Sequence, residues 1–218
     1  MSLGDVLFPG NPERREKVIR RSQELIELMK SNFRATNSLT EIVNKHLHSS
    51  FSPITLNEKA TVKENCDVMI KRVNQIQAKV EEVDEELKKK LEPTVYESLQ
   101  KMSLQDFKKL SAVVKVAIKS VCQIAAAVIV KYLMKNIRIL TNITCTCAKV
   151  AVGTFASIVL GVLIDVIISA IVGHIERAKL ESALAEYEEA LKTFRPASKE
   201  YEMAIYEVMF MLKHMKKK

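Results

Sequence analysis

The clearest hydrophobic pattern in the chain lies between residues 62 and 87. Eight apolar residues recur there at alternating spacings of four and three: Val62, Cys66, Met69, Val73, Ile76, Val80, Val83 and Leu87. This heptad seam predicts an amphipathic helix that packs its apolar face against other helices. Charged residues fill most positions between the seam residues, as expected of a solvated outer face. The sequence Leu91-Glu92-Pro93 then breaks or kinks the helix.

Helical periodicity also lies on either side of this seam. Asn11 and Pro12 form a favourable helix start, and the apolar residues that follow predict a helix to about His48, although Thr36 and Thr40 interrupt its stripe. Near the C-terminus, the four-three spacing runs through Leu180, Leu184, Tyr187, Leu191, Phe194, Ser198, Tyr201, Ile205, Val208, Leu212 and Met215. These residues predict an amphipathic helix that Pro196 divides or bends.

A third helix is predicted in the middle of the chain, from Leu104 to about Arg138. Residues 120–130 at its centre carry no charge, but these 11 residues are too few to cross a bilayer unaided. The polar residues within 136–146 predict a turn after this helix.

The longest apolar stretch runs from Val150 to Gly173 and contains one charged residue. As an α-helix it would extend about 36 Å, more than the roughly 30 Å of a hydrocarbon core. We therefore predict a membrane segment at 150–173. The segment begins at Val150 and ends at Gly173, and its charged residue is Asp165. The small residues Gly153, Ser157 and Gly161 recur every four positions and would permit close contact with another helix. The alternative is the buried centre of a soluble bundle, which is also apolar on all sides.

Asp165 bears on how this segment is arranged. A lone carboxylate at the bilayer centre costs about 2.5 to 3.5 kcal/mol on insertion scales, and the surrounding Leu, Ile, Val and Phe residues offset such a cost. If the segment pairs with the preceding helix as a hairpin, Lys119 and Lys131 are the candidate charge partners of Asp165. A single span is the leading prediction, and the hairpin is its closest rival.

Composition favours an all-α fold. Only 5 of the 218 residues are Gly and 5 are Pro, which is few for the turns of a many-stranded β-fold. We predict an elongated bundle of long amphipathic or coiled-coil helices around a central apolar helix or helical hairpin. By sequence character the chain divides into an N-terminal coiled-coil region (1–103), an apolar region (104–175) and a C-terminal amphipathic region (176–218).

The net charge of +8 does not by itself identify a partner. Lys and Arg are interleaved with Glu and Asp, and no aromatic residues accompany them as a stacking platform for bases. Nucleic acid is therefore not expected as a partner. The basic tail, Lys213 with Lys216 to Lys218, is interpreted first as a solvated helix end and second as a polybasic membrane contact.

The residues with reactive side chains form no recognisable catalytic or metal-binding motif. Cys145 and Cys147 lack further ligands at a suitable spacing for a metal. They are interpreted first as structural thiols and second, from their place before the apolar run, as candidates for lipidation. No Gly-rich phosphate loop or nucleophilic triad is present in the sequence. We expect no enzyme activity, no cofactor and no small-molecule substrate.

Four stretches of the chain carry a resemblance to a known family: MSLGDVLFPGNPERR, TVKENCDVMIKRV, the LEPTVY turn, and GVLIDVIISAIVG followed by a charged helix. Together they resemble the single-pass membrane and coiled-coil domain-containing protein 3 family, a vertebrate family, in short blocks over most of the chain. The resemblance implies one membrane span and a coiled coil. It implies no activity, and a hairpin would depart from its single span.

Three functions follow from these patterns. The first is a membrane-associated scaffold, anchored by 150–173, whose coiled-coil faces bind a helical partner or a second copy while much of the chain faces the cytosol. The second is an initially soluble bundle that inserts a hairpin, from about Ala112 to Gly173, into membranes in the manner of an α-helical pore-forming protein. The third is a soluble coiled-coil interaction protein.

Overall fold

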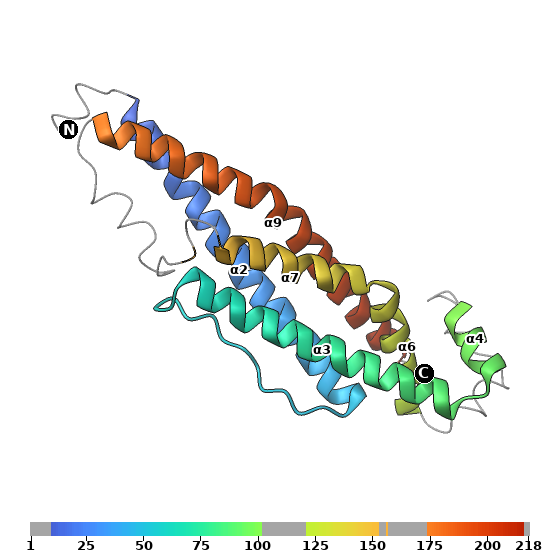
Figure 1. Cartoon of the computed structure of the whole chain (residues 1–218). Helices are drawn as coiled ribbons and strands as arrows, with labels where there is room; N and C mark the ends of the chain where they lie inside the picture. Colours follow the sequence, from blue (N-terminus) through green and yellow to red (C-terminus); the bar gives the residue numbers. More distant parts are fainter. Residues whose placement is uncertain (1–9, 102–120, 153–155, 157–173, 216–218) are drawn as a thin grey trace. The chain divides into compact units, whose positions relative to one another are not determined.

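The computed structural model describes residues 10–101, 121–152, 156 and 174–215 (Figure 1). Within these residues it contains six α-helices: α2 (Asn11–Leu47), α3 (Val62–Lys90), α4 (Pro93–Lys101), α6 (Val121–Lys135), α7 (Ile137–Val152) and α9 (His174–Met215). The prediction of an all-α helical bundle is therefore confirmed.

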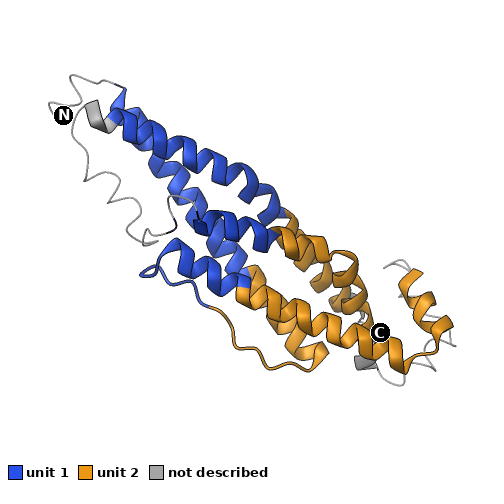
Figure 2. Ribbon diagram, in the orientation of Figure 1, with its two compact units in different colours: residues 1–34, 55–70, 143–199 blue, residues 35–54, 71–142, 200–218 orange. Residues whose placement is uncertain are grey.

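The helices contribute to two compact units (Figure 2). Unit 1 comprises residues 1–34, 55–70 and 143–199, and unit 2 comprises residues 35–54, 71–142 and 200–218. Four helices, α2, α3, α7 and α9, have residues in both units. The regions 1–103, 104–175 and 176–218 remain predictions about sequence character.

In unit 1, α2 and α9 pack side by side and run in the same direction (Figure 1). An ion pair joins Arg14 to Glu181, with Nε and Oε1 3.1 Å apart. A second joins Arg21 to Glu188, seven residues further along both helices. This equal step fixes a parallel, heptad-spaced pairing. Apolar seam residues of both helices, among them Leu25, Met29, Tyr187, Leu191 and Phe194, are buried.

Unit 1 also contains the start of α3 and the end of α7. Thr61 and Glu64 form a capping box at the start of α3, in which each residue binds the other's backbone N–H. The Lys63 N–H donates to the Ala156 carbonyl at 3.0 Å, whereas Met69, further along α3, contacts Cys147. From Lys63 to Met69 the residue number along α3 rises, whereas the number of the residue in contact falls from 156 to 147. The start of α3 and this part of the chain therefore run antiparallel.

The link between α2 and α3, residues 48–61, has no regular secondary structure up to a turn at 58–60, and we call it the strap. In unit 2, α2 is followed directly by His48, whose φ of 53° is left-handed. The Asn44 side-chain amide then donates to the Phe51 carbonyl (2.8 Å) and accepts from the Phe51 N–H (2.9 Å). Asn37 binds Ile54 in the same two-bond manner. Because Asn37 precedes Asn44, the strap runs back along α2.

The strap places α3 parallel to α2 in unit 2. Leu47, from the last turn of α2, lines a cavity of about 260 Å³ together with Val83 and Leu87, from the last turns of α3. The C-terminal ends of both helices therefore meet. Arg72 of α3 lies over the Phe51 ring, 5.3 Å from its centroid, and donates to the Ser52 carbonyl.

In unit 2, α6 is buried on all sides over residues 125–133. The nine residues from Ala125 to Leu133 are buried without interruption, as expected of a helix with no polar face. Lys131 is among them, and its ammonium group donates to the Leu99 carbonyl of α4 at 2.5 Å. The Tyr132 hydroxyl donates to Glu207 of α9, also at 2.5 Å.

The turn predicted at 136–146 is wrong. The helical pattern is interrupted only at Asn136, and α7 continues from Ile137 to Val152. One face of α7 carries Leu140, Ile143, Cys147 and Val150, which are spaced by three and four and are all buried. The prediction gave too much weight to the polar residues between them. The Thr141 hydroxyl bonds back to the Ile137 carbonyl (3.2 Å), so its polar group is accommodated within a helix.

Pro196 likewise lies inside α9, which continues without a break to Met215. The sequence left open whether this proline divides or bends the helix. The unbroken assignment shows that it does not divide it.

Candidate interaction surface

The predicted seam of α3 is packed inside the chain. Six of its residues are buried: Val62, Cys66, Met69, Val73, Ile76 and Val80. The last two, Val83 and Leu87, are half-buried and line the cavity beside Leu47. The seam therefore packs against helices of the same molecule, and a partner that used this face would have to displace them.

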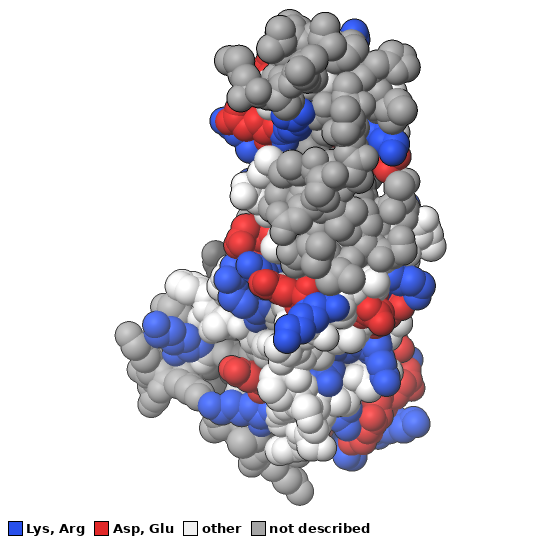
Figure 3. All heavy atoms as spheres, turned by 90° about the vertical axis from the view of Figure 1, so that its left-hand side faces the viewer, with Lys and Arg blue, Asp and Glu red and all other residues white. Residues whose placement is uncertain are grey.

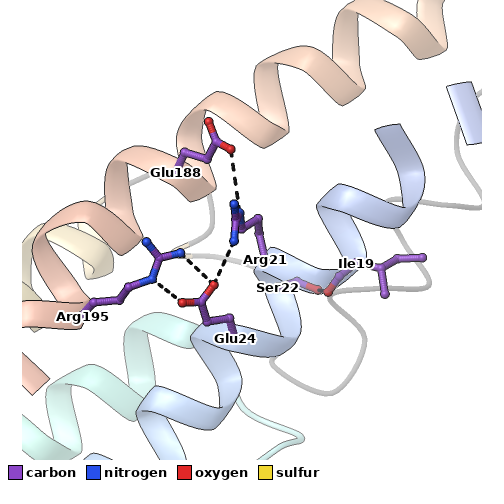
Figure 4. A network of polar contacts seen from close by, with 6 residues as sticks. All are labelled: Ile19, Arg21, Ser22, Glu24, Glu188 and Arg195. Atoms are coloured by element: carbon purple, nitrogen blue, oxygen red, sulfur yellow. Dashed lines mark hydrogen bonds and ion pairs between the residues drawn. The ribbon is translucent and has the colours of Figure 1, made fainter. Parts of the chain in front are cut away.

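The α2–α9 pairing in unit 1 is flanked by a network of charged side chains (Figure 4). Arg195 donates to both carboxylate oxygens of Glu24, through Nε to Oε1 and through Nη2 to Oε2. Arg21 binds the same carboxylate at 3.3 Å and Glu188 at 3.8 Å. Hydrogen bonds from Arg195, and then from Arg21, lower the pKa of Glu24. Such pairs beside an apolar seam fix partner and register more than they stabilise.

Buried polar residues also occupy positions in the seam between α2 and α9. In unit 1, the Asn32 amide donates to the Ser198 hydroxyl at 2.9 Å. In unit 2, the Thr36 and Tyr201 hydroxyls lie 2.9 Å apart. The irregular stripe of the N-terminal helix is thus a seam in which Asn32 and Thr36 have partners on α9, while the Thr40 hydroxyl donates to the Thr36 carbonyl of α2 itself. Buried polar pairs of this kind tie a helix pair to one register.

The residues of the predicted membrane segment are only partly described. Val150 and Ala151 are buried at the end of α7, and Val152 is 83% exposed. Gly153, Ser157, Gly161, Asp165 and Gly173 lie outside the described residues. None of the helices in the part of the chain that the structure describes is both long and apolar enough to cross a membrane.

The structure describes only one of the two candidate charge partners of Asp165. Lys119 lies outside the described residues, as does Asp165 itself. Lys131 is only 6% exposed, and its ammonium group is bound to the Leu99 carbonyl. Pairing of Lys131 with Asp165 therefore stays a prediction.

The two candidate lipidation sites point in different directions from α7. Cys145 is exposed and Cys147 is buried. The Cys147 sulfur lies 3.8 Å from the Met69 sulfur, and its hydrogen bond with Cys66, together with burial, raises the pKa of the Cys147 thiol. Among the described residues, no group of three or more His, Cys, Asp and Glu side chains converges as a metal site.

A different surface of α9 carries exposed apolar side chains. In unit 2, Met203 is 60% exposed, Tyr206 62%, Met209 40% and Phe210 62%. By helical periodicity Met203, Tyr206 and Phe210 share one face, nearly opposite the buried seam through Tyr201, Ile205 and Val208. We call these four exposed residues the α9 outer face. Their spacing is visible in the sequence, but the apolar seam on the opposite side of the helix was the stronger pattern, and these four residues were not predicted as a surface.

A cationic groove adjoins this face. It has a volume of about 480 Å³ and is lined by Glu41, Ile42, Lys45, His46, Met209, Leu212 and Lys213. Met209 belongs to both the groove and the outer face. Two lysines oppose one glutamate in the lining, so the groove carries positive charge beside exposed apolar groups.

Elsewhere on the surface the charges are mixed. Figure 3 shows one side of the molecule, on which basic and acidic side chains alternate without a broad patch of either sign. Many charged residues of the described chain form pairs within one helix, such as Lys17 with Glu13 and Lys90 with Glu86. Exposed pairs of this kind contribute little to stability.

In the part of the chain that the structure describes, the fold and the surface define an all-α helical bundle with buried heptad seams and an exposed apolar face on α9. Over residues 14–163, well over half of its length, the chain matches the model of a family described as protein of unknown function (DUF4533). The chain belongs to this family. No solved structure matches it.

Proposed function

We propose that the protein is a membrane-associated helical scaffold without catalytic activity, anchored by residues 150–173. The observation that carries the scaffold part of the proposal is that the heptad seams close within one chain. Six α3 seam residues are buried, and α2 is locked to α9 by the Asn32–Ser198 bond and the Glu24–Arg195 pair. A bundle that is already assembled in this way offers its outer surfaces, rather than its seams, for self-association or for a helical partner.

The anchor is supported by the sequence. The apolar stretch from Val150 to Gly173 contains one charged residue, and as a helix it is long enough to cross a hydrocarbon core. The resemblance to a single-pass membrane family adds support to the same proposal.

Arginine substitution within the segment tests the anchor. Gly161→Arg with Leu163→Arg places two charges near its centre, where each costs about 2.5 to 3.5 kcal/mol on insertion scales. We expect the variant to pass from the carbonate-resistant membrane fraction into the soluble fraction. Val68→Arg on the outer face of α3, where Val68 is 42% exposed, is the control and should be retained. Unchanged retention of the double variant contradicts the anchor.

A second candidate function is favoured by α6. The continuous burial of Ala125 to Leu133 and the bond from Lys131 to Leu99 hold an apolar helix inside unit 2. An initially soluble bundle that releases such a helix with the following apolar stretch would insert a hairpin into a membrane. Leakage of dye from liposomes on addition of purified soluble protein supports this function. Protease protection separates the two arrangements, because a single span places the termini on opposite sides and a hairpin places them on the same side.

A further inference from the structure

We propose that the α9 outer face, with the cationic groove beside it, binds the anionic surface of a lipid bilayer. The inference rests on the proposed function in taking a membrane as the setting, but it assigns a second contact, separate from residues 150–173. Its basis is the juxtaposition in unit 2 of Met203, Tyr206 and Phe210, exposed at 60%, 62% and 62%, with the lysines of the groove.

The apolar part of this surface has the composition of an interfacial helix. Helices that lie in the plane of a membrane interface bury aromatic and long apolar side chains at the boundary of headgroups and acyl chains, and carry Lys or Arg nearby. Tyr206 and Phe210 supply the aromatic rings, one with a polar hydroxyl suited to the headgroup level. Met203 and Met209 supply flexible apolar side chains beside them.

The charge of the adjoining residues selects the kind of surface. Lys45 and Lys213 line the groove, opposed within it by Glu41, and the sequence continues after the helix with Lys216, Lys217 and Lys218. The acidic residues on this part of α9 are Glu200, Glu202 and Glu207, of which Glu207 is bound by the Tyr132 hydroxyl at 2.5 Å. Basic residues next to an apolar face are attracted by the negative potential of anionic lipids, which falls off within a Debye length.

The charge beside the apolar face argues for an anionic bilayer over a second copy of the chain. A symmetric dimer places the same patch of both copies together, so the groove lysines of one copy would face those of the other. Like charges brought together in this way oppose association, whereas anionic lipid headgroups attract the same lysines. Each apolar group that enters the lipid then contributes separately to binding.

The absence of Trp from the sequence provides a local test. Phe210→Trp, made in the full-length chain, places a single tryptophan on the outer face, and we call this protein the outer-face reporter. Val68→Trp places one on the exposed face of α3 and is the matched control reporter. Each protein is reconstituted into vesicles of phosphatidylcholine alone or with phosphatidylserine, and the emission wavelength and quenching by bromine-labelled lipid are measured.

The proposal predicts that emission of the outer-face reporter shifts to the blue and is quenched by brominated lipid only in the vesicles with phosphatidylserine. High salt should reverse both effects, and the control reporter should show neither. The double variant Lys213→Glu with Lys217→Glu should weaken binding to the vesicles with phosphatidylserine at least tenfold, because each basic residue near the surface contributes ~fivefold to the affinity. Lys179→Glu with Lys192→Glu, at exposed positions earlier on α9, should leave it unchanged.

Three results would overturn the inference. The first is a signal from the outer-face reporter that is the same in both kinds of vesicle. The second is a blue shift that grows with protein concentration in the absence of lipid, which would report self-association. The third is an equal loss of the reporter signal in the two double lysine variants. The anchor is judged separately from the same samples. Retention of the protein in vesicles without a response of the outer-face reporter leaves the anchor standing and removes this contact. If the reporter still responds after Gly161→Arg and Leu163→Arg are added, but the protein is no longer retained in the membrane fraction, this contact stands and the anchor keeps its role in retention.

Discussion

The α3 seam and the α2–α9 seam use the same heptad spacing for different purposes. The α3 seam is apolar at all eight positions, whereas the α2–α9 seam includes the buried pairs Asn32–Ser198 and Thr36–Tyr201. An apolar helix seam gains stability from burial but tolerates a shift in register by one heptad, since one apolar group replaces another. A polar seam gains less from burial, but each pair forms in one register only. Stability and register are thus supplied by different parts of the bundle.

The largest expected effect is the loss of packing in the α3 seam. Val73→Ala removes two buried carbon groups and leaves a cavity, so we expect a loss of about 2 kcal/mol in the free energy of unfolding. Val68→Ala is the same substitution at a position 42% exposed on the same helix, and should cost under ~0.5 kcal/mol. Chemical denaturation measures both. Equal losses would mean that the α3 seam does not supply the stability assigned to it.

The next effect concerns the polar seam. Asn32→Ala leaves the buried Ser198 hydroxyl without its partner, and we expect a loss of about 1 to 2 kcal/mol. The double variant with Ser198→Ala should recover part of this loss, because no buried hydroxyl is then left behind. A double-mutant cycle gives the coupling energy, and a value near zero would remove the Asn32–Ser198 bond as a determinant of register.

A smaller effect is expected at the strap, whose position decides that α3 runs parallel to α2. Asn44→Ala removes both bonds to Phe51, and Asn37→Ala removes both bonds to Ile54. Each substitution should cost about 1 kcal/mol. Hydrogen exchange of the Phe51 amide should rise in the Asn44 variant, and that of the Ile54 amide in the Asn37 variant. A uniform rise throughout the bundle would instead indicate global destabilisation.

The smallest effect is expected from the ion pairs beside the α2–α9 seam. The Glu24 pKa lies below its ordinary value of 4.5 because Arg195 and Arg21 bind the carboxylate. The network therefore stabilises the fold above about pH 4.5 and is lost as the pH falls through the lowered pKa. Glu24→Gln should cost under ~1 kcal/mol at neutral pH and should flatten the decline in stability between about pH 5 and 3. An unchanged pH profile would show that Glu24 does not contribute.

Residues 150–173 and the α9 outer face differ in how they were found. The first is a continuous apolar run that any hydropathy profile displays, and its structure lies outside the described residues apart from Val150–Val152 and residue 156. The second has only four apolar side chains and becomes evident from their exposure. Burial and exposure depend on which neighbours cover a residue, so they can be read reliably only from the packed structure.

The helical class, the seam of α3 and the seam of α9 were predictable from the order of residues alone, because a period of 3.6 residues is written locally in the alternation of apolar and polar side chains. The same reasoning missed α7, in which an apolar face of Leu140, Ile143 and Cys147 lies between polar residues that were taken for a turn. The parallel pairing of α2 with α9 is evident only in the folded chain, where residues 167 positions apart form the Arg14–Glu181 bond. The physical reason is that a seam shows only that a helix packs against an apolar neighbour. The identity and direction of that neighbour depend on which buried polar groups and charges bind one another, and these lie far apart along the chain.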